Sequence, residues 1–212
     1  KGKHLYPGFI APNTQLGLVE IESVRATVDA GEIGELNPNA RSIIAYDSDS
    51  EVPPTVRAQG ILLAQITPRG GLLSGQSSVV QLDAWNWEDA AYKTDIGLHL
   101  NWPNMFSFNW REGNISKNVN YDKEVGIIET YLSEAQAYCK NDKPAEKNLK
   151  LESACALFNG SRKLFLHSDD AKAITAGVLL AKRFGITPVV VGGGDAAIIA
   201  DFLRENHVPV IL

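Results

Sequence analysis

The last fifty residues constrain the fold most, because strand and helix patterns alternate there. Short apolar strands are predicted at 164–167, 187–191 and 208–212, and helices lie between them at 169–184 and 195–206. Consecutive strands joined by helices pair in parallel through right-handed crossovers. The sequence therefore predicts an α/β protein with a parallel sheet in this region.

Further elements are predicted upstream of this alternation. Apolar residues at helical spacing predict a helix of about twenty residues that begins at Asp122 and runs to Cys139. A proline-initiated short helix is predicted at 52–60 and a buried strand at 61–67. The Gly/Ser-rich stretch 69–78 is predicted to be a loop before a short strand at 79–82.

The region from about 83 to 120 contains all four tryptophans and little regular periodicity. It is predicted to be an elaborated loop, and its aromatic content argues against disorder. The tryptophans are Trp85, Trp87, Trp102 and Trp110.

Composition excludes several classes of partner. The 212 residues carry a net charge of −5 without a cluster of Lys or Arg, so neither a nucleic acid nor an anionic membrane is predicted to bind. No apolar run reaches the length of a membrane span. The protein is expected to be soluble, with a cytoplasmic or a periplasmic location left open. Cys139 and Cys155 lack metal-ligand spacing and are predicted to be two buried thiols.

The stretch 6–17 holds the first chemically informative pattern. A Pro7-Gly8 turn leads into an apolar strand, and Asn13 and Gln15 at its far end are one residue apart. Alternation along a strand places these two amide side chains on the same side. The stretch therefore predicts a pair of amides at the end of a strand.

This stretch resembles the first strand of the amidohydrolase superfamily, and in particular of its imidazolonepropionase-like branch. The similarity rests on 2–10, from Gly2-Lys3-His4 through Pro7-Gly8-Phe9-Ile10, followed by two ligand positions and Gly17. It extends to Gly75-Gln76-Ser77-Ser78, to Leu166-His167-Ser168-Asp169-Asp170, and to 189–195. It thus covers essentially the whole chain.

The resemblance implies a particular fold, of which this chain would form only a part. It implies a partial (β/α)8 TIM-type barrel over residues 1–212, with its site at the carboxyl ends of the strands. The β-sandwich domain and the last strands of the family would lie outside this chain. We therefore expect a portion of a longer polypeptide, or a chain that pairs with another copy, because an incomplete barrel exposes strand edges.

The resemblance also implies a chemistry that this chain has altered. Active relatives use zinc or another divalent metal to activate water for hydrolysis of C–N bonds in small-molecule substrates. Asn13 and Gln15 stand where the first two histidine ligands are expected, and neutral amides are poor zinc ligands. His167 matches the fifth-strand ligand, although a histidine ending an apolar strand is also typical of a hydrogen-bonded structural residue.

Two further site positions are expected from the same resemblance. Gly193 lies in a glycine turn that replaces a sixth-strand histidine and can either cradle an anion or place Asp195 as a helix N-cap. Gln81 is the nearest position to the family's bridging residue. His99 can line a pocket or serve packing. The family's catalytic aspartate would lie beyond Leu212.

Three functional hypotheses follow. The first is an amidohydrolase-superfamily protein with a degenerate metal site, in which no metal is expected and the fold persists for binding or assembly. The second is an active hydrolase of C–N bonds with an altered mononuclear site that includes His167. The third is a non-enzymatic small-molecule or carbohydrate binder that uses the tryptophans.

Overall fold

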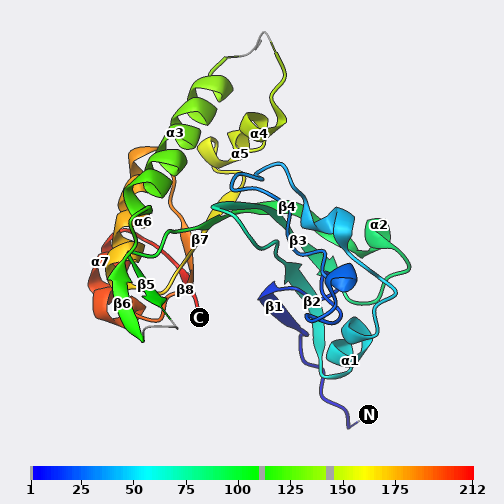
Figure 1. Ribbon diagram of the computed structural model, residues 1–212. Coiled ribbons are helices and arrows are strands. Elements are labelled where there is room, and N and C mark those ends of the chain that lie inside the picture. Colours follow the sequence, from blue (N-terminus) through cyan, green and yellow to red (C-terminus); the bar gives the residue numbers. More distant parts are fainter. Residues whose placement is uncertain (1, 110–112, 142–145) are drawn as a thin grey trace.

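The computed structural model describes residues 2–109, 113–141 and 146–212. Its main element is a mixed sheet of seven strands in the order β1-β2-β3-β4-β7-β8-β9, and β5 and β6 form a separate pair (Figure 1). The strands are β1 (Phe9–Thr14), β2 (Ile61–Ile66), β3 (Leu73–Gln81), β4 (Ala91–Asn101), β5 (Phe106–Asn109), β6 (Asn114–Lys117), β7 (Lys163–Ser168), β8 (Val189–Gly192) and β9 (Val210–Ile211).

Helices of very different lengths connect these strands. The α-helices are α1 (Val52–Ala58), α2 (Trp87–Ala90), α3 (Tyr121–Cys139), α4 (Leu149–Glu152), α5 (Cys155–Phe158), α6 (Ala171–Arg183) and α7 (Ala200–Glu205). The 3-10 helices are η1 (Arg25–Thr27), η2 (Ser42–Ala45) and η3 (Ala196–Ile199).

The directions of the strands determine at which edge of the sheet their carboxyl ends lie. Strand β3 pairs antiparallel with both β2 and β4, and every other neighbouring pair in the sheet is parallel. Six of the seven strands therefore run in one direction. Their carboxyl ends meet along one edge of the sheet, as in parallel α/β sheets.

The predicted partial (β/α)8 barrel is wrong. That architecture needs a helix after each strand and parallel neighbours throughout, whereas β2, β3 and β4 follow one another as antiparallel neighbours. The prediction rested on the family resemblance, which did not reveal that β3 inserts antiparallel between β2 and β4. The predicted alternation of strands and helices is confirmed in the last fifty residues, where β7, β8 and β9 are parallel.

Strand β3 includes the predicted strand residues 79–81 and extends back through 73–78, where a Gly/Ser-rich loop was predicted. Its polar residues Ser74, Gln76, Ser77 and Ser78 are buried, and each takes part in a hydrogen bond to another segment. Ser77 Oγ accepts from Gln65 Nε2 at 3.0 Å, for example, and Gln76 Nε2 donates to the Pro38 carbonyl at 2.8 Å. Tertiary hydrogen bonding therefore overrides the weak strand propensity of these residues.

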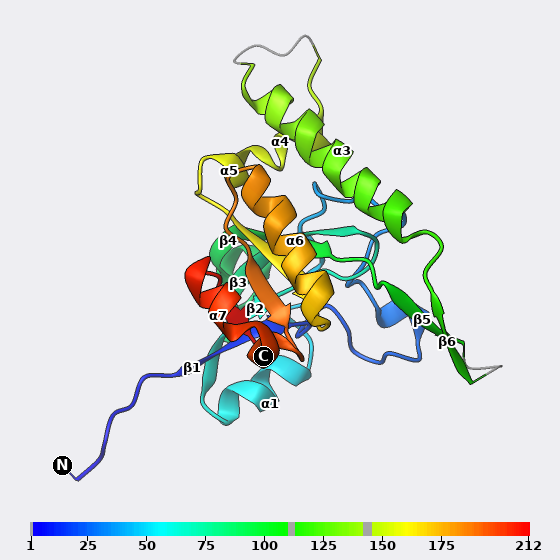
Figure 2. The same cartoon turned by 90° about the vertical axis from the view of Figure 1, so that its left-hand side faces the viewer.

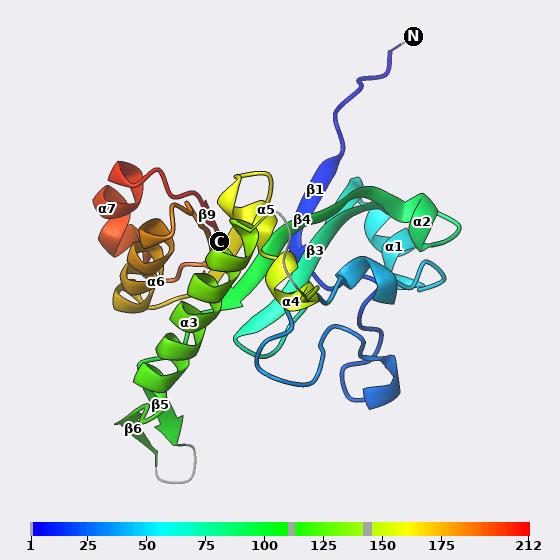
Figure 3. The same cartoon turned by 90° about the horizontal axis from the view of Figure 1, so that it is seen from above.

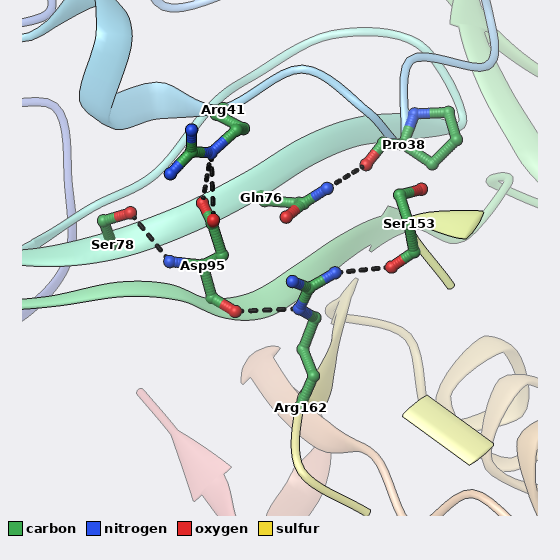
Figure 4. A network of polar contacts seen from close by, with 7 residues as sticks. All are labelled: Pro38, Arg41, Gln76, Ser78, Asp95, Ser153 and Arg162. Carbon is green, nitrogen blue, oxygen red and sulfur yellow. Dashed lines mark hydrogen bonds and ion pairs between the residues drawn. The ribbon is translucent and has the colours of Figure 1, made fainter. Parts of the chain in front are cut away.

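Strand β4 runs through the region that was predicted to be a tryptophan-rich loop. It contains an irregular point at Asp95, whose φ is 53°, and three contacts hold this residue (Figure 4). Its carboxylate accepts both 2.9 Å bonds from Arg41 Nε, and its N–H donates to Ser78 Oγ at 3.0 Å. Its carbonyl accepts from Arg162 Nε at 2.8 Å, while Arg162 Nη1 donates to the Ser153 carbonyl.

The larger core lies between the sheet and the helices α3 and α6. The predicted long helix is confirmed as α3, and it buries Ile128, Leu132 and Ala135. Helix α6 buries Ile174 and Val178 against the same cluster. Figure 2 shows α6 lying across the sheet and α3 extending beyond it.

Helix α6 begins at Ala171, two residues after the predicted start at residue 169. Ser168 is the last residue of β7, and the N-cap is Asp170, whose carboxylate accepts from the Lys172 and Ala173 N–H groups. An aspartate accepts such bonds as well as serine does. The extension of β7 by one residue therefore moves the cap along the chain.

The prediction of two buried thiols is wrong, because Cys139 and Cys155 form a disulfide with a Cα–Cα separation of 5.4 Å. The bond links the end of α3 to the start of α5. It joins residues 16 positions apart and matches no sequence motif. Only the packing of the two helices brings the cysteines together.

A second core lies beneath the first half of the chain and joins β2 and β3 to η2 through Ile43, Ala64, Ile66 and Val80. Residues 2–8 are exposed and lead away from this core (Figure 3).

No helix within the described ranges is both long and apolar enough to cross a membrane.

Candidate functional site

A polar cavity of about 420 Å³ opens at the carboxyl edge of the sheet. Its walls come from the ends of four strands and the residues that follow them. The lining residues are Asn13, Gln15, Thr67, Pro68, Arg69, Gly70, Asn101 and His167. A neighbouring cavity of about 500 Å³ shares Gln15, Arg69 and Gly70, so Arg69 borders both. We call the first cavity the edge pocket.

Asn13, Gln15 and His167 meet in the edge pocket, so the structure brings together three of the five predicted site positions. Asn13 has a φ of 49°, in the left-handed region that asparagine tolerates better than most residues. The pairing between β1 and β2 is irregular from Ala11 to Thr14, so the simple alternation used for the prediction does not hold there. The Asn13 backbone N–H donates a hydrogen bond to Gln65 Oε1 at 3.4 Å.

Gln81 lies elsewhere. It pairs with Leu63 on β2, away from the carboxyl end of that strand, and its side-chain amide donates to the Asp89 carbonyl at 2.9 Å. Because β3 runs against its neighbours, its last residue points to the opposite edge of the sheet. Gln81 is therefore not part of the edge pocket.

Gly193 lies near the edge at the end of β8 but does not line the pocket. Its N–H donates to the Ser168 carbonyl at 2.9 Å, and the N–H of Gly194 donates to Asp169 Oδ1 at 3.2 Å. These two N–H donors of the turn are therefore already used in hydrogen bonds within the chain. Asp195 begins η3, but its carboxylate accepts from the Ala171 N–H rather than capping that helix.

His99 is the main residue that the sequence left undecided. It is fully buried on β4, stacks on Phe165 with ring centroids 4.7 Å apart, and places Nδ1 at 2.7 Å from His167 Nε2. Its other nitrogen, Nε2, is buried without a hydrogen-bond partner in the described structure. The sequence does not reveal this contact, because the two residues are 68 positions apart.

The orphaned nitrogen indicates which tautomer the pair adopts. A buried N–H without an acceptor is rarer and costlier than a buried lone pair without a donor. We therefore place the His99 proton on Nδ1, where it donates to His167 Nε2. His167 then carries its own proton on Nδ1, because a neutral imidazole has one donor and one acceptor.

Electrostatics keep both rings neutral. Burial lowers the pKa of His99 well below its usual range, and His167 adds to this effect. The pKa of His167 is lowered to about 4, mainly by burial and also by the positive charge of Arg69, while Asp169 opposes the shift. Neutral rings agree with a single shared hydrogen bond between them.

Thr67 and Arg69 add two polar groups that have no partner in the described structure. Thr67 Oγ1 is buried and makes no hydrogen bond. Arg69 is exposed, its backbone N–H donates to the Ala30 carbonyl, and its guanidinium contacts no carboxylate among the described residues. A signal for these residues existed in the sequence, since they directly follow the apolar strand β2.

The residues of the edge pocket do not fit a zinc centre. Zinc binds imidazole nitrogen, thiolate or carboxylate ligands, but the pocket offers the amides of Asn13, Gln15 and Asn101 and one histidine. The Nε2 lone pair of that histidine accepts the hydrogen bond from His99 in the tautomer given above. Within the described residues, no three His, Cys, Asp or Glu side chains are grouped to hold a metal.

The tryptophans do not form one binding surface. Trp102 is buried and donates Nε1 to the Tyr121 hydroxyl at 3.3 Å, whereas Trp85 is 92% exposed. Trp87 packs partly buried against the second core. Trp110 lies outside the described residues.

No protein-family model and no curated protein matches the sequence. Among solved structures, the crystal structure of an amidohydrolase from Thermotoga maritima is similar, with a TM-score of 0.86 and 21% sequence identity. The match covers 98% of this chain and 56% of that one. The likeness shows a shared fold, and this chain spans little more than half the length of that protein.

Proposed function

We propose that this chain is the site-bearing part of an amidohydrolase-type protein whose edge pocket binds a small polar molecule without zinc. The shared fold with the Thermotoga maritima amidohydrolase supports the first half of the proposal. The observation that carries the second half is the set of polar side chains that line the pocket, three amides and one histidine, whose Nε2 lies 2.7 Å from His99 Nδ1. The amides of Asn13 and Gln15 line the same pocket.

Metal analysis of the purified full chain tests this proposal. We expect a small fraction of an equivalent of zinc or iron after dialysis against metal-free buffer, because amide oxygens bind zinc poorly. One tightly bound zinc or iron per chain would overturn the proposal. It would favour the active hydrolase with an altered mononuclear site that includes His167.

A gain-of-function variant sharpens the test. The double substitution Asn13→His with Gln15→His supplies two imidazoles at the pocket wall, so we expect zinc affinity, measured by calorimetry, to rise by at least roughly tenfold. The matched control is the amide exchange Asn13→Gln with Gln15→Asn, which should leave zinc affinity unchanged. Zinc binding by the unsubstituted chain that equals the histidine variant would contradict the proposal.

Activity measurements separate the rival hypothesis. Hydrolysis of cyclic amides or N-acylated amino acids that is abolished both by a chelator and by His167→Ala would establish a metal-dependent hydrolase. We expect no hydrolysis of these substrates that a chelator abolishes.

A further inference from the structure

The edge pocket presents one cationic side chain to a bound molecule. Arg69 is exposed, its guanidinium makes no ion pair among the described residues, and the other side chains that line the pocket are neutral. We propose that the edge pocket binds the carboxylate of a small organic acid, which accepts hydrogen bonds from the Arg69 guanidinium. This proposal rests on the proposed function, since it names the class of molecule bound.

His167 offers the pocket a donor rather than an acceptor. Its Nε2 accepts from His99 at 2.7 Å, and in that tautomer its proton lies on Nδ1. The 2.7 Å contact with the fully buried His99 favours this orientation of the His167 ring. An imidazole N–H supports a bound oxyanion, whereas the opposite tautomer would present a lone pair that repels it.

The charges of the pocket favour a single negative charge. Arg69 is the one charged side chain among its lining residues, and a planar guanidinium matches a planar carboxylate with two parallel hydrogen bonds. Asp169, which follows β7, is close enough to influence His167. Its negative charge disfavours a doubly charged phosphate at the same place.

The neutral amides can bind the remainder of such a molecule. Asn13 and Gln15 each carry two N–H donors and one carbonyl acceptor, and both line the pocket. An acid that also contains an amide or a hydroxyl group can therefore use these side chains beyond its carboxylate. This makes N-acetylglycine a suitable probe.

Calorimetric titration of the full, chelator-treated chain tests the proposal with three probes. We expect N-acetylglycine to bind with one molecule per chain, and the neutral analogue N-acetylglycinamide to bind at least roughly tenfold more weakly. Inorganic phosphate should bind more weakly than N-acetylglycine. Equal binding of the neutral analogue, tighter binding of phosphate, or no binding of N-acetylglycine would each overturn the proposal.

One variant and its control assign the binding to Arg69. Arg69→Gln should weaken the binding of N-acetylglycine by roughly tenfold or more, because it removes the charge that pairs with the carboxylate. The control Arg204→Gln removes an arginine from the exposed surface of α7, where it pairs with Asp201, and should change nothing. An unchanged affinity in Arg69→Gln overturns the assignment.

The outcome is independent of the metal test. Zinc found in the untreated chain, together with Arg69-dependent binding after chelation, refutes only the zinc-free function. A chain without zinc that also fails to bind N-acetylglycine refutes only the carboxylate site.

Discussion

At the scale of the residue, the histidine pair has a measurable effect on stability. Burial lowers the pKa of both His99 and His167, so the folded chain binds fewer protons than the unfolded chain in mildly acidic solution. Unfolding then takes up protons, and stability rises with pH wherever the unfolded state binds more of them. The stabilisation is fully present above the usual histidine pKa of about 6.5.

We therefore expect stability to fall as the pH drops from about 6.5 toward about 4, the pKa of His167 in the folded chain. Each of the two histidines contributes a slope of about 1.4 kcal/mol per pH unit within this window. Urea unfolding at several pH values measures the slope, and His167→Asn should reduce it.

The control for this experiment is His4→Gln, which changes a histidine in the exposed N-terminal segment. This variant should show the same slope of unfolding free energy against pH as the unsubstituted chain. Carboxylates titrate in the same window, so the difference between variants is the quantity that matters. An equal slope in His167→Asn and in the unsubstituted chain would refute a shared, neutral pair.

At the scale of the element, the disulfide holds α5 against the end of α3. It closes a loop between Cys139 and Cys155, 16 positions apart. A cross-link of this length restricts the unfolded chain and typically stabilises by about 2–4 kcal/mol. Such bonds persist in oxidising compartments.

Replacement of both cysteines by serine should therefore lower the free energy of unfolding by about 2–4 kcal/mol. Denaturant unfolding with and without a reductant measures the effect. The reductant should destabilise the unsubstituted chain by a similar amount and leave the double variant unaffected. Two titratable thiols in the unfolded, unreduced chain would show that the bond does not form.

The elements differ in how well sequence predicted them. The helix α3 was predicted because Ile128, Leu132 and Ala135 repeat at helical spacing, and that periodicity is local. The first part of β3, residues 73–78, was missed because Ser74, Ser77 and Ser78 have loop propensity and become strand residues only when neighbouring strands satisfy their hydrogen bonds. Asn13, Gln15 and His167 were predicted as site positions from the resemblance to the amidohydrolase superfamily, whereas the role of His99 depends on a partner from another strand.

At the scale of the whole molecule, the sheet ends on an exposed strand. Phe9 and Ile10 of β1 are 71% and 61% exposed, and Leu62 on the neighbouring strand β2 is 48% exposed. Exposed apolar strand edges favour pairing with another chain. We propose that the chain associates with a further copy of itself through β1.

Light scattering coupled to size-exclusion chromatography tests this association. The chain should elute with a mass above its own 23.0 kDa, and Phe9→Lys with Ile10→Lys should return it to a monomer because edge lysines block strand pairing. The control Ile33→Lys changes a loop residue that is 94% exposed and should not alter the mass. A monomer at every concentration of the unsubstituted chain would contradict the proposal.

The sequence alone determined the features that depend on neighbours along the chain. These are the parallel strands of the last fifty residues, the long amphipathic helix, and the polar residues that follow apolar strands. Tertiary structure decided the rest, because it depends on contacts between distant segments. It set β3 antiparallel to its neighbours, brought Cys139 and Cys155 into a disulfide, and placed His99 in contact with His167. It also brought Asn13, Gln15 and His167 together as the lining of one pocket.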